Sequence, residues 1–273
     1  MGTGLFAPYY RAWRRPRGVV GDDNPDELSS TANLAIKDRG GIILPTSRLP
    51  VARRSLVSMS YAYRARSECA LDVASTYPGG DYLEFGSTSL ATFRSFLGAF
   101  YLHHGDGPNF TDTRFYAFDI FGDPDRGSGA PAEDAGYFEG HRVPGEHSMA
   151  TNSLEPYGSL SKRCVMVPGY FQDTLNDALK AKMKAEKRRV GFAFLDCSLG
   201  SSYKTVFDFL LDVIGRERMF IYLDEYFIDA QPSVHILYAD FCAEAKRRHN
   251  LDSLYMRNAA GCGALFSLMP AGN

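Results

Sequence analysis

Residues 219–227 read MFIYLDEYF, and they begin with an apolar run that does not alternate with polar residues. An apolar run of this length is typical of a strand buried on both faces, as in a parallel sheet covered by helices. The run stops at two adjacent carboxylates, Asp224 and Glu225. Neighbouring carboxylates are costly to bury unless a cation or hydrogen-bond donors hold them. The stretch therefore predicts a parallel sheet with a polar site at the end of this strand.

The same succession of an apolar run and an amphipathic segment repeats along the chain. Strands are predicted at residues 82–85, 114–121, 163–170, 190–198 and 218–227, and helices at 50–75, 87–104, 171–189, 201–215 and 233–249. This alternation predicts an α/β fold with a doubly wound, mostly parallel, Rossmann-like sheet. The tail at 254–269 has the pattern of two strands around a glycine-rich turn, which predicts an antiparallel C-terminal hairpin at the sheet edge.

Two segments of the chain lack this alternation. Residues 1–49 are rich in Gly, Pro and Asp, and we interpret them as an N-terminal arm or lid that precedes one domain at 50–273. Residues 122–160 contain many glycines and several prolines without periodicity. A long irregular segment inside a domain is usually functional, so 122–160 is predicted to cover an active site.

Composition excludes several classes of function. The 273-residue chain has a formal net charge of −2, which gives no electrostatic reason to expect a nucleic-acid partner. No apolar stretch is long enough to span a bilayer or to act as a secretory signal, so neither a membrane partner nor secretion is expected. The five cysteines are scattered without a CxxC motif, which favours reduced thiols and a cytoplasmic location. The sequence leaves the oligomeric state open, a homo-oligomer included.

Acidic residues stand at the ends of four predicted strands. Glu84, Asp119 and Asp196 close three of them, and Asp224 with Glu225 closes the fourth. Any one of these residues can be explained as a helix cap or a turn former. Together they favour a polar ligand site, because ligands of open α/β sheets bind beyond the carboxyl ends of the strands.

The first strand and its turn favour a nucleotide-like ligand. Gly86 allows a tight turn after YLEF, and Asp119 stands where an acid can accept hydrogen bonds from both ribose hydroxyls. The sequence contains neither GxGxxG after this strand nor GxxxxGK[ST] anywhere. These absences disfavour a pyrophosphate cofactor and exclude the P-loop nucleotidases.

Four blocks of sequence carry a more specific resemblance. They are YLEFGSTSLATFRSF (82–96), FYAFDIFGDPD (115–125), VPGYFQDTL (167–175) and the pair FAFLDCSLGSSYKTVFDFLL (192–211) with FIYLDEYF (220–227). In this order they resemble the macrocin O-methyltransferase-like family of class I S-adenosylmethionine-dependent methyltransferases, from about residue 80 to 245. The resemblance implies S-adenosylmethionine as cofactor and a small-molecule acceptor. We expect methylation of a hydroxyl group on a sugar or another secondary metabolite, such as an antibiotic.

The resemblance also implies cofactor contacts for individual residues. Glu84, Gly86 and Ser87 match the motif that contacts the methionine part of the cofactor, and Asp119 matches the acid that binds the ribose. Three residues after the third strand match the adenine pocket: Tyr170, Phe171 and Gln172. Asp196 is expected beside the cofactor as well.

A metal and a general base complete the expected site. The resemblance places a divalent cation among Asp196, Asp224 and Glu225, and carboxylate oxygens suit Mg²⁺. The alternative is that Asp224 or Glu225 caps backbone amides or pairs with an arginine. Family members carry a second Asp where this chain has Ser198, which cannot act as a base at neutral pH. The catalytic candidates are therefore His235, because histidine is the residue type that most often acts as a general base, and Asp196.

Two rival functions remain. Ser198 is compatible with a protein that binds the cofactor without catalysis. A nicotinamide-dependent oxidoreductase can share the same sheet architecture, although the missing GxGxxG motif speaks against it.

Overall fold

The computed structural model describes residues 61–87, 90–105, 110, 112–121, 154–197, 199–224, 226–227, 234–258 and 263–272. The chain divides into two compact units, 1–64 and 65–273, and the second contains nearly all of the described residues. The predicted N-terminal arm at 1–49 and most of the predicted cover segment at 122–160 lie outside the described residues.

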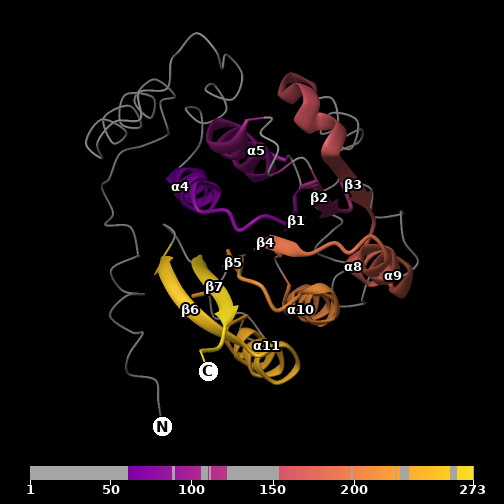
Figure 1. Cartoon of the computed structure of the whole chain (residues 1–273), viewed down its shortest axis with the longest axis vertical. Helices are drawn as coiled ribbons and strands as arrows, with labels where there is room; N and C mark the ends of the chain where they lie inside the picture. Colours follow the sequence, from indigo (N-terminus) through magenta and orange to yellow (C-terminus); the bar gives the residue numbers. More distant parts are fainter. Residues whose placement is uncertain are drawn as a thin grey trace. The chain divides into compact units, whose positions relative to one another are not determined.

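The described residues of the second unit form a seven-stranded sheet in the order β3-β2-β1-β4-β5-β7-β6 (Figure 1). The strands are β1 (Asp81–Phe85), β2 (Phe115–Asp119), β3 (Cys164–Pro168), β4 (Val190–Leu195), β5 (Met219–Leu223), β6 (Leu251–Asn258) and β7 (Ala264–Pro270). The strands from β3 to β5 pair in parallel, whereas β7 runs antiparallel to both β5 and β6. The predicted mostly parallel sheet with an antiparallel edge hairpin is confirmed.

Helices cover both faces of this sheet (Figure 1). One layer contains α4 (Tyr61–Ser75), α5 (Ala91–His104) and the 3-10 helix η2 (Glu155–Arg163). The other contains α8 (Phe171–Thr174), α9 (Asp177–Ala185), α10 (Gly200–Val213) and α11 (Val234–His249). Each layer of helices packs against one face of the sheet, so the described residues form two apolar cores, one on each face. β4 and β5 lie between the two cores and are buried at every position, because they are apolar throughout.

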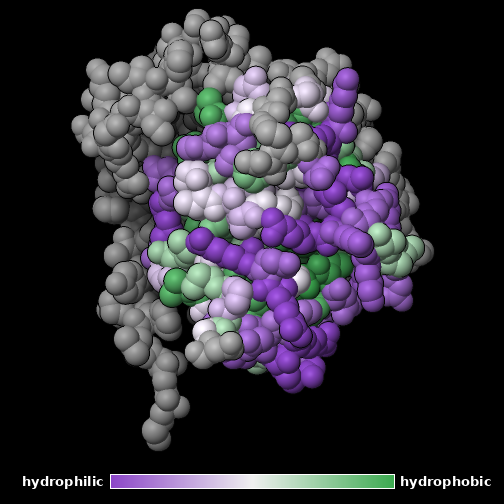
Figure 2. Space-filling model, in the orientation of Figure 1, coloured by the Kyte–Doolittle hydropathy of each residue, from purple (hydrophilic) through white to green (hydrophobic). Residues whose placement is uncertain are grey.

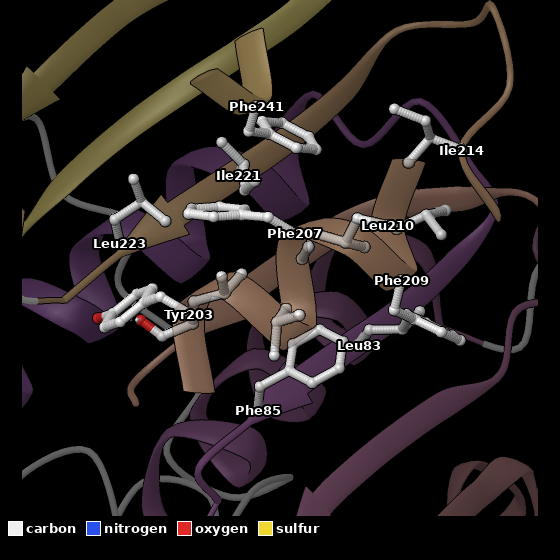
Figure 3. Close-up of a cluster of buried hydrophobic side chains, with 14 of the residues drawn as sticks. Leu83, Phe85, Tyr203, Phe207, Phe209, Leu210, Ile214, Ile221, Leu223 and Phe241 are labelled. Atoms are coloured by element: carbon white, nitrogen blue, oxygen red, sulfur yellow. Dashed lines mark hydrogen bonds between the residues drawn. The ribbon is translucent and has the colours of Figure 1, made fainter. Parts of the chain in front are cut away.

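The two cores have different compositions. On the side of α10 and α11, Phe207 and Leu210 gather with Ile221 of β5 and Phe241 of α11 (Figure 3). On the side of α5, phenylalanine and tyrosine rings predominate, and Tyr82 of β1 is stacked on a ring of α5. Aromatic rings bury large areas and fix one another's orientation through edge and face contacts, so this second core is expected to hold its side chains rigidly.

A buried ion pair fixes the amino end of β1. Asp81 is fully buried, and its Oδ2 accepts a hydrogen bond of 2.8 Å from the Arg188 Nε just before β4. Its Oδ1 accepts a hydrogen bond of 2.9 Å from the backbone N–H of Arg114, just before β2. One carboxylate therefore holds the starts of three neighbouring strands in register, since a buried charge must keep its partners.

The visible surface is mainly hydrophilic over α9 and α11, and an apolar area lies over β6 (Figure 2). Within that area Leu254, Tyr255 and Met256 are exposed. No described helix is long and apolar enough to cross a membrane. The four described cysteines are free thiols, as expected, and burial raises the pKa of Cys69 to about 12.

Several predicted elements need correction. The helix expected at 171–189 is two helices, because the chain turns and the side chain of Asn176 caps the second by accepting from the backbone N–H of Leu179 at 3.0 Å. The end of the segment expected to be irregular forms η2, and Leu160 within it is buried in the core. The strands expected at 114–121, 163–170, 190–198 and 218–227 end earlier, at Asp119, Pro168, Leu195 and Leu223, because the backbone leaves the sheet there.

Candidate active site

The order of the strands identifies the edge where a ligand fits. The chain passes from β1 outward to β2 and β3, and then returns to place β4 on the opposite side of β1. The loops that leave β1 and β4 therefore diverge to opposite faces, which opens a crevice beyond their carboxyl ends. Glu84 and Phe85 close β1 on one side of this switch point, and Leu195 closes β4 on the other.

Four of the predicted site residues stand side by side at this edge. The strands pair Phe118 with Phe85, Phe85 with Leu195, and Leu195 with Leu223. The next residue in each strand belongs to one row, which we call the carboxyl-edge row: Asp119, Gly86, Asp196 and Asp224. Backbone hydrogen bonds of 2.9 Å continue the sheet into the row at its last three members. Three of the predicted acids therefore stand next to one another or to Gly86 along this edge, whereas Glu84 lies two residues before it and Glu225 lies outside the described residues.

Gly86 occupies a position that other residues cannot take. Its φ is +88°, a conformation that glycine adopts without strain. A Cβ at this position would also overlap the backbone carbonyl oxygen of Asp196. The glycine therefore serves two purposes, a tight turn after β1 and a close approach of the β1 and β4 backbones. This local geometry keeps the crevice narrow at the switch point.

Glu84 lies two residues before the row and is nearly completely buried, with 1% of its surface exposed. The hydroxyl of Tyr82, which is buried too, donates a hydrogen bond to Glu84 Oε2. Burial raises the pKa of the Tyr82 phenol well above its usual range, and the charge of Glu84 adds to the effect. The phenol therefore stays protonated and able to donate. Ser87, also buried, donates to the Glu84 carbonyl oxygen at 3.3 Å, which closes the turn.

Asp119 is held by its own loop. Its Oδ1 accepts a hydrogen bond of 2.8 Å from the backbone N–H of Phe121, whose φ of +49° is unusual for a bulky residue. Strained backbone conformations tend to occur where a loop must hold a functional group. The turn fixes the carboxylate of Asp119 at the outer end of the carboxyl-edge row, next to β3.

The third predicted cluster follows β3. Tyr170 is buried, Phe171 packs edge-on against Phe85 of β1 at a ring distance of 5.9 Å, and Gln172 is exposed.

Asp173, which sequence reasoning missed, has a buried Oδ2 that accepts no hydrogen bond in the structure. A buried carboxylate oxygen without a donor is unusual, and it suits a ligand that supplies one. No sequence signal distinguished it from an ordinary first-turn acid of a helix.

Asp224 closes the other end of the row. It is 9% exposed, and its Oδ1 accepts a hydrogen bond of 2.9 Å from the hydroxyl of Tyr222. The Tyr222 ring stacks on Phe194 at 4.3 Å, and Gly263, just before β7, leaves room for the phenol because a Cβ there would overlap its hydroxyl. Asp224 thus has a rigid support from two neighbouring strands.

The predicted cation site is described only in part. Asp196 and Asp224 are neighbours in the carboxyl-edge row, while Glu225 lies outside the described residues. Among the residues that the structure describes, no three His, Cys, Asp or Glu side chains gather as a metal site would require. Two adjacent carboxylates alone do not make a cation site of the expected kind.

His235 lies near the end of β5 through an aromatic contact. Its ring is 6.5 Å from the ring of Tyr226, two residues after Asp224, and its side chain is exposed. This placement agrees with the expected position beside the acidic loop, and it does not by itself assign a role as base. Ser198 lies outside the described residues.

No protein-family model matches the chain, and no curated protein matches its sequence. Solved structures do match the fold. CalS11, a calicheamicin methyltransferase, gives a TM-score of 0.53 at 19% identity, over 90% of this chain and 93% of CalS11. The O-methyltransferase NovP gives a TM-score of 0.53 at 17% identity, over 90% of this chain and 98% of NovP. The chain therefore shares its Rossmann-like α/β fold with these two methyltransferases.

At these identities the likeness concerns the fold of the chain. What individual residues do in this fold must follow from the geometry of the carboxyl-edge row and of the residues behind it. That geometry is a glycine turn at the switch point, with an ordered acid on either side of it.

Proposed function

We propose that the chain is an S-adenosylmethionine-dependent O-methyltransferase that methylates a hydroxyl group of a small molecule. The observation that carries the proposal is Gly86 at the switch point of the sheet, between Asp119 and Asp196 in the carboxyl-edge row. A narrow glycine turn lets a ligand approach the backbone, and an acid at the end of the next strand suits ribose hydroxyls. The fold shared with CalS11 and NovP, both described as methyltransferases, supports this reading.

We assign the ribose, the adenine and the methionine part of the cofactor to residues at the ends of three different strands. Asp119 would accept hydrogen bonds from the ribose, and Tyr170 and Phe171 would border the adenine beside Gln172. The buried Oδ2 of Asp173 is suited to accept from the amino group of the base. Glu84 and Ser87 would hold the methionine part. Each assignment matches a donor with an acceptor, because the ligand groups are hydroxyls, amines and an ammonium.

S-adenosylmethionine supplies a methyl group on a positively charged sulfur, which a substrate oxygen takes. The chain contributes a negative field at the place of this charge through Asp196 and Asp224. It must also remove the proton of the substrate hydroxyl. Asp196, in the carboxyl-edge row, and His235, near the end of β5, are the groups proposed to receive it. A sugar or another secondary metabolite is the proposed substrate, and a cytoplasmic protein is expected.

Mg²⁺ has weaker support than the cofactor. Asp224 already accepts a hydrogen bond from Tyr222, and the described carboxylates do not form a three-ligand set. We therefore derive no step of the reaction from a cation. Mg²⁺ remains a variable of the experiment, in which activity with the ion is compared with activity in excess chelator.

Calorimetric titration with S-adenosylhomocysteine tests the proposal directly. Binding in the micromolar range is expected, and a ligand at about 100 times its Kd should stabilise the native state by about 2.7 kcal/mol. NAD at the same concentration is the control and should neither bind nor stabilise. Binding of NAD without S-adenosylhomocysteine would favour an oxidoreductase, and the absence of binding by either would refute the proposal.

A transfer assay separates an enzyme from a protein that only binds the cofactor. Methyl-labelled S-adenosylmethionine is incubated with a panel of hydroxylated sugars and polyketide-like metabolites, with Mg²⁺ or with chelator. Label in a product ether is the expected result. Tight cofactor binding with no transfer across the panel would support the binding-protein alternative.

A further inference from the structure

The β1 pair, Tyr82 with Glu84, contains a hydroxyl that packing alone does not explain. The Tyr82 ring is surrounded by four phenylalanine rings: Phe93, Phe96, Phe115 and Phe192. It stacks on Phe96 at 4.1 Å and has no exposed surface. A phenylalanine would fill the same place without the cost of burying a hydroxyl. The hydroxyl is compensated by its hydrogen bond to Glu84 Oε2.

The carboxylate of Glu84 is equally unusual. It occupies a strand position level with Phe194 of β4, where the neighbouring side chains are apolar. A buried carboxylate is unfavourable in its charged form unless donors or a cation stabilise it. The Tyr82 phenol, two residues earlier in the same strand, supplies one such donor. The rigid ring cluster fixes the position of this donor, and hence of Oε2, relative to the turn at Gly86.

We propose that Tyr82 is a positioning residue of the cofactor site: it holds the Glu84 carboxylate, charged and correctly oriented, for the ammonium group of the methionine part. This inference rests on the proposed function and deepens it. The ammonium is the one cationic group of S-adenosylhomocysteine, so a fixed anion in a place excluded from water favours it strongly. The base and ribose are recognised elsewhere, at Asp119 and after β3.

Ligand choice gives a test that a general loss of structure would not mimic. The probes are S-adenosylhomocysteine and 5′-methylthioadenosine, which keeps the base, the ribose and the sulfur but lacks the amino-acid part. In Tyr82→Phe, affinity for S-adenosylhomocysteine should fall at least tenfold, whereas affinity for methylthioadenosine should change less than twofold. Calorimetry measures both, and a melting curve of the ligand-free variant checks that it is folded.

The matched control is Tyr222→Phe, which removes the phenol of the same kind of pair on β5. It should leave both affinities unchanged. Glu84→Gln is the second variant, since the amide still accepts from Tyr82 but carries no charge. It should show the same selective loss, and the double variant Tyr82→Phe/Glu84→Gln should lose little more than Glu84→Gln alone, because the two residues act as one unit.

The outcomes separate this inference from the proposed function. If the wild-type chain binds S-adenosylhomocysteine and Tyr82→Phe weakens both ligands equally, or neither, Tyr82 is only a core residue and the inference is wrong. Additive losses in the double variant would overturn it as well. If the wild-type chain binds neither ligand, the proposed function is wrong, and this inference, which rests on it, is wrong as well.

Discussion

Two strands of the sheet carry the same short pattern at different depths. β1 contains Tyr82-Leu83-Glu84, and β5 with the following turn contains Tyr222-Leu223-Asp224. In both, a buried phenol donates to the carboxylate two residues later, on the face of the sheet that α5 covers. However, Glu84 pairs with Phe194 of β4, and Phe194 pairs with Tyr222 of β5. Glu84 is therefore level with Tyr222 and not with Asp224. The β5 pair is therefore shifted by two residues, about 6.5 Å, towards the carboxyl edge.

This shift gives similar pairs different surroundings. Glu84 lies two residues before the turn at Gly86 and is nearly completely buried, so we expect only the end of a bound ligand to reach it. Asp224 lies in the carboxyl-edge row, where a second molecule can approach. We expect the position of each pair along its strand, more than its residue types, to decide whether the pair contacts the cofactor or the methyl acceptor. The predictions below test that division.

The largest effect is expected at Gly86, which lies between the two pairs. Gly86→Ala places a side chain at positive φ and against the Asp196 carbonyl oxygen, so the free energy of unfolding should fall by about 3 kcal/mol. Urea denaturation measures this change. Gly272→Ala is the control, since a Cβ there meets nothing within 4 Å, and it should be nearly neutral. Equal effects at both glycines would show that the turn is not strained.

Gly263→Ala should break the β5 pair and spare the β1 pair. The new methyl group would displace the Tyr222 hydroxyl from Asp224, with a loss of stability of about 1–3 kcal/mol from overpacking. Binding of S-adenosylhomocysteine should nevertheless persist, because Gly86 and Glu84 are untouched. Calorimetry on the folded variant measures it. Loss of the ligand in this variant would contradict a division of the site by depth.

Asp119→Ala should weaken S-adenosylhomocysteine about tenfold, or about 1.4 kcal/mol, by removing acceptors for the ribose hydroxyls. Asp119→Asn keeps an oxygen for the backbone N–H of Phe121 and so separates damage to the turn from loss of the charge. Asp224→Asn, at the other end of the row, should bind the ligand as the wild type does. A similar loss in Asp119→Ala and Asp224→Asn would mean that both ends of the row serve the cofactor.

The smallest effect concerns pH. The raised pKa of Tyr82 means that the folded state keeps a proton that the unfolded state releases above about pH 10, so the free energy of unfolding should decline there. Tyr82→Phe should reduce this decline by up to about 1.4 kcal/mol per pH unit. Unfolding curves between pH 9 and 11 measure the slopes. An unchanged slope would show that the phenol titrates normally.

Much of this architecture was predictable from local pattern. The runs that became β4 and β5 are apolar at every position, which is typical of strands buried on both faces. The acids that follow them, Asp196 and Asp224, were expected at one edge of the sheet, and they stand next to each other there because parallel strands bring their carboxyl ends together. Strand ends were less predictable, since the turn occurs at the row and not where the apolar residues stop.

The remaining features depend on contacts between distant parts of the chain. Gly263 matters through the Tyr222 ring on a neighbouring strand, and nothing in its local sequence shows that closeness. Asp173 differs from any other acid at a helix start only because its Oδ2 is buried without a donor. Side-chain alternation puts Tyr82 and Glu84 on one face, so the β1 pair could have been found in the sequence, although Tyr82 was not among the predicted site residues. The phenylalanine rings that surround Tyr82 were not predictable, because they come from α5, β2 and β4.

The place of β7 in the sheet has a consequence for the order of assembly. Among the described strands β7 is made last, yet it lies between β5 and β6, and Gly263 comes just before it. During synthesis β1 to β5 can pair while β5 is still an open edge, and β6 has no sheet neighbour until β7 arrives. The proposed cofactor side of the site, at Glu84 and Gly86, can therefore form on a partly made chain. The proposed methyl-acceptor side, at Asp224, is complete only when β7 pairs with β5 beside Tyr222.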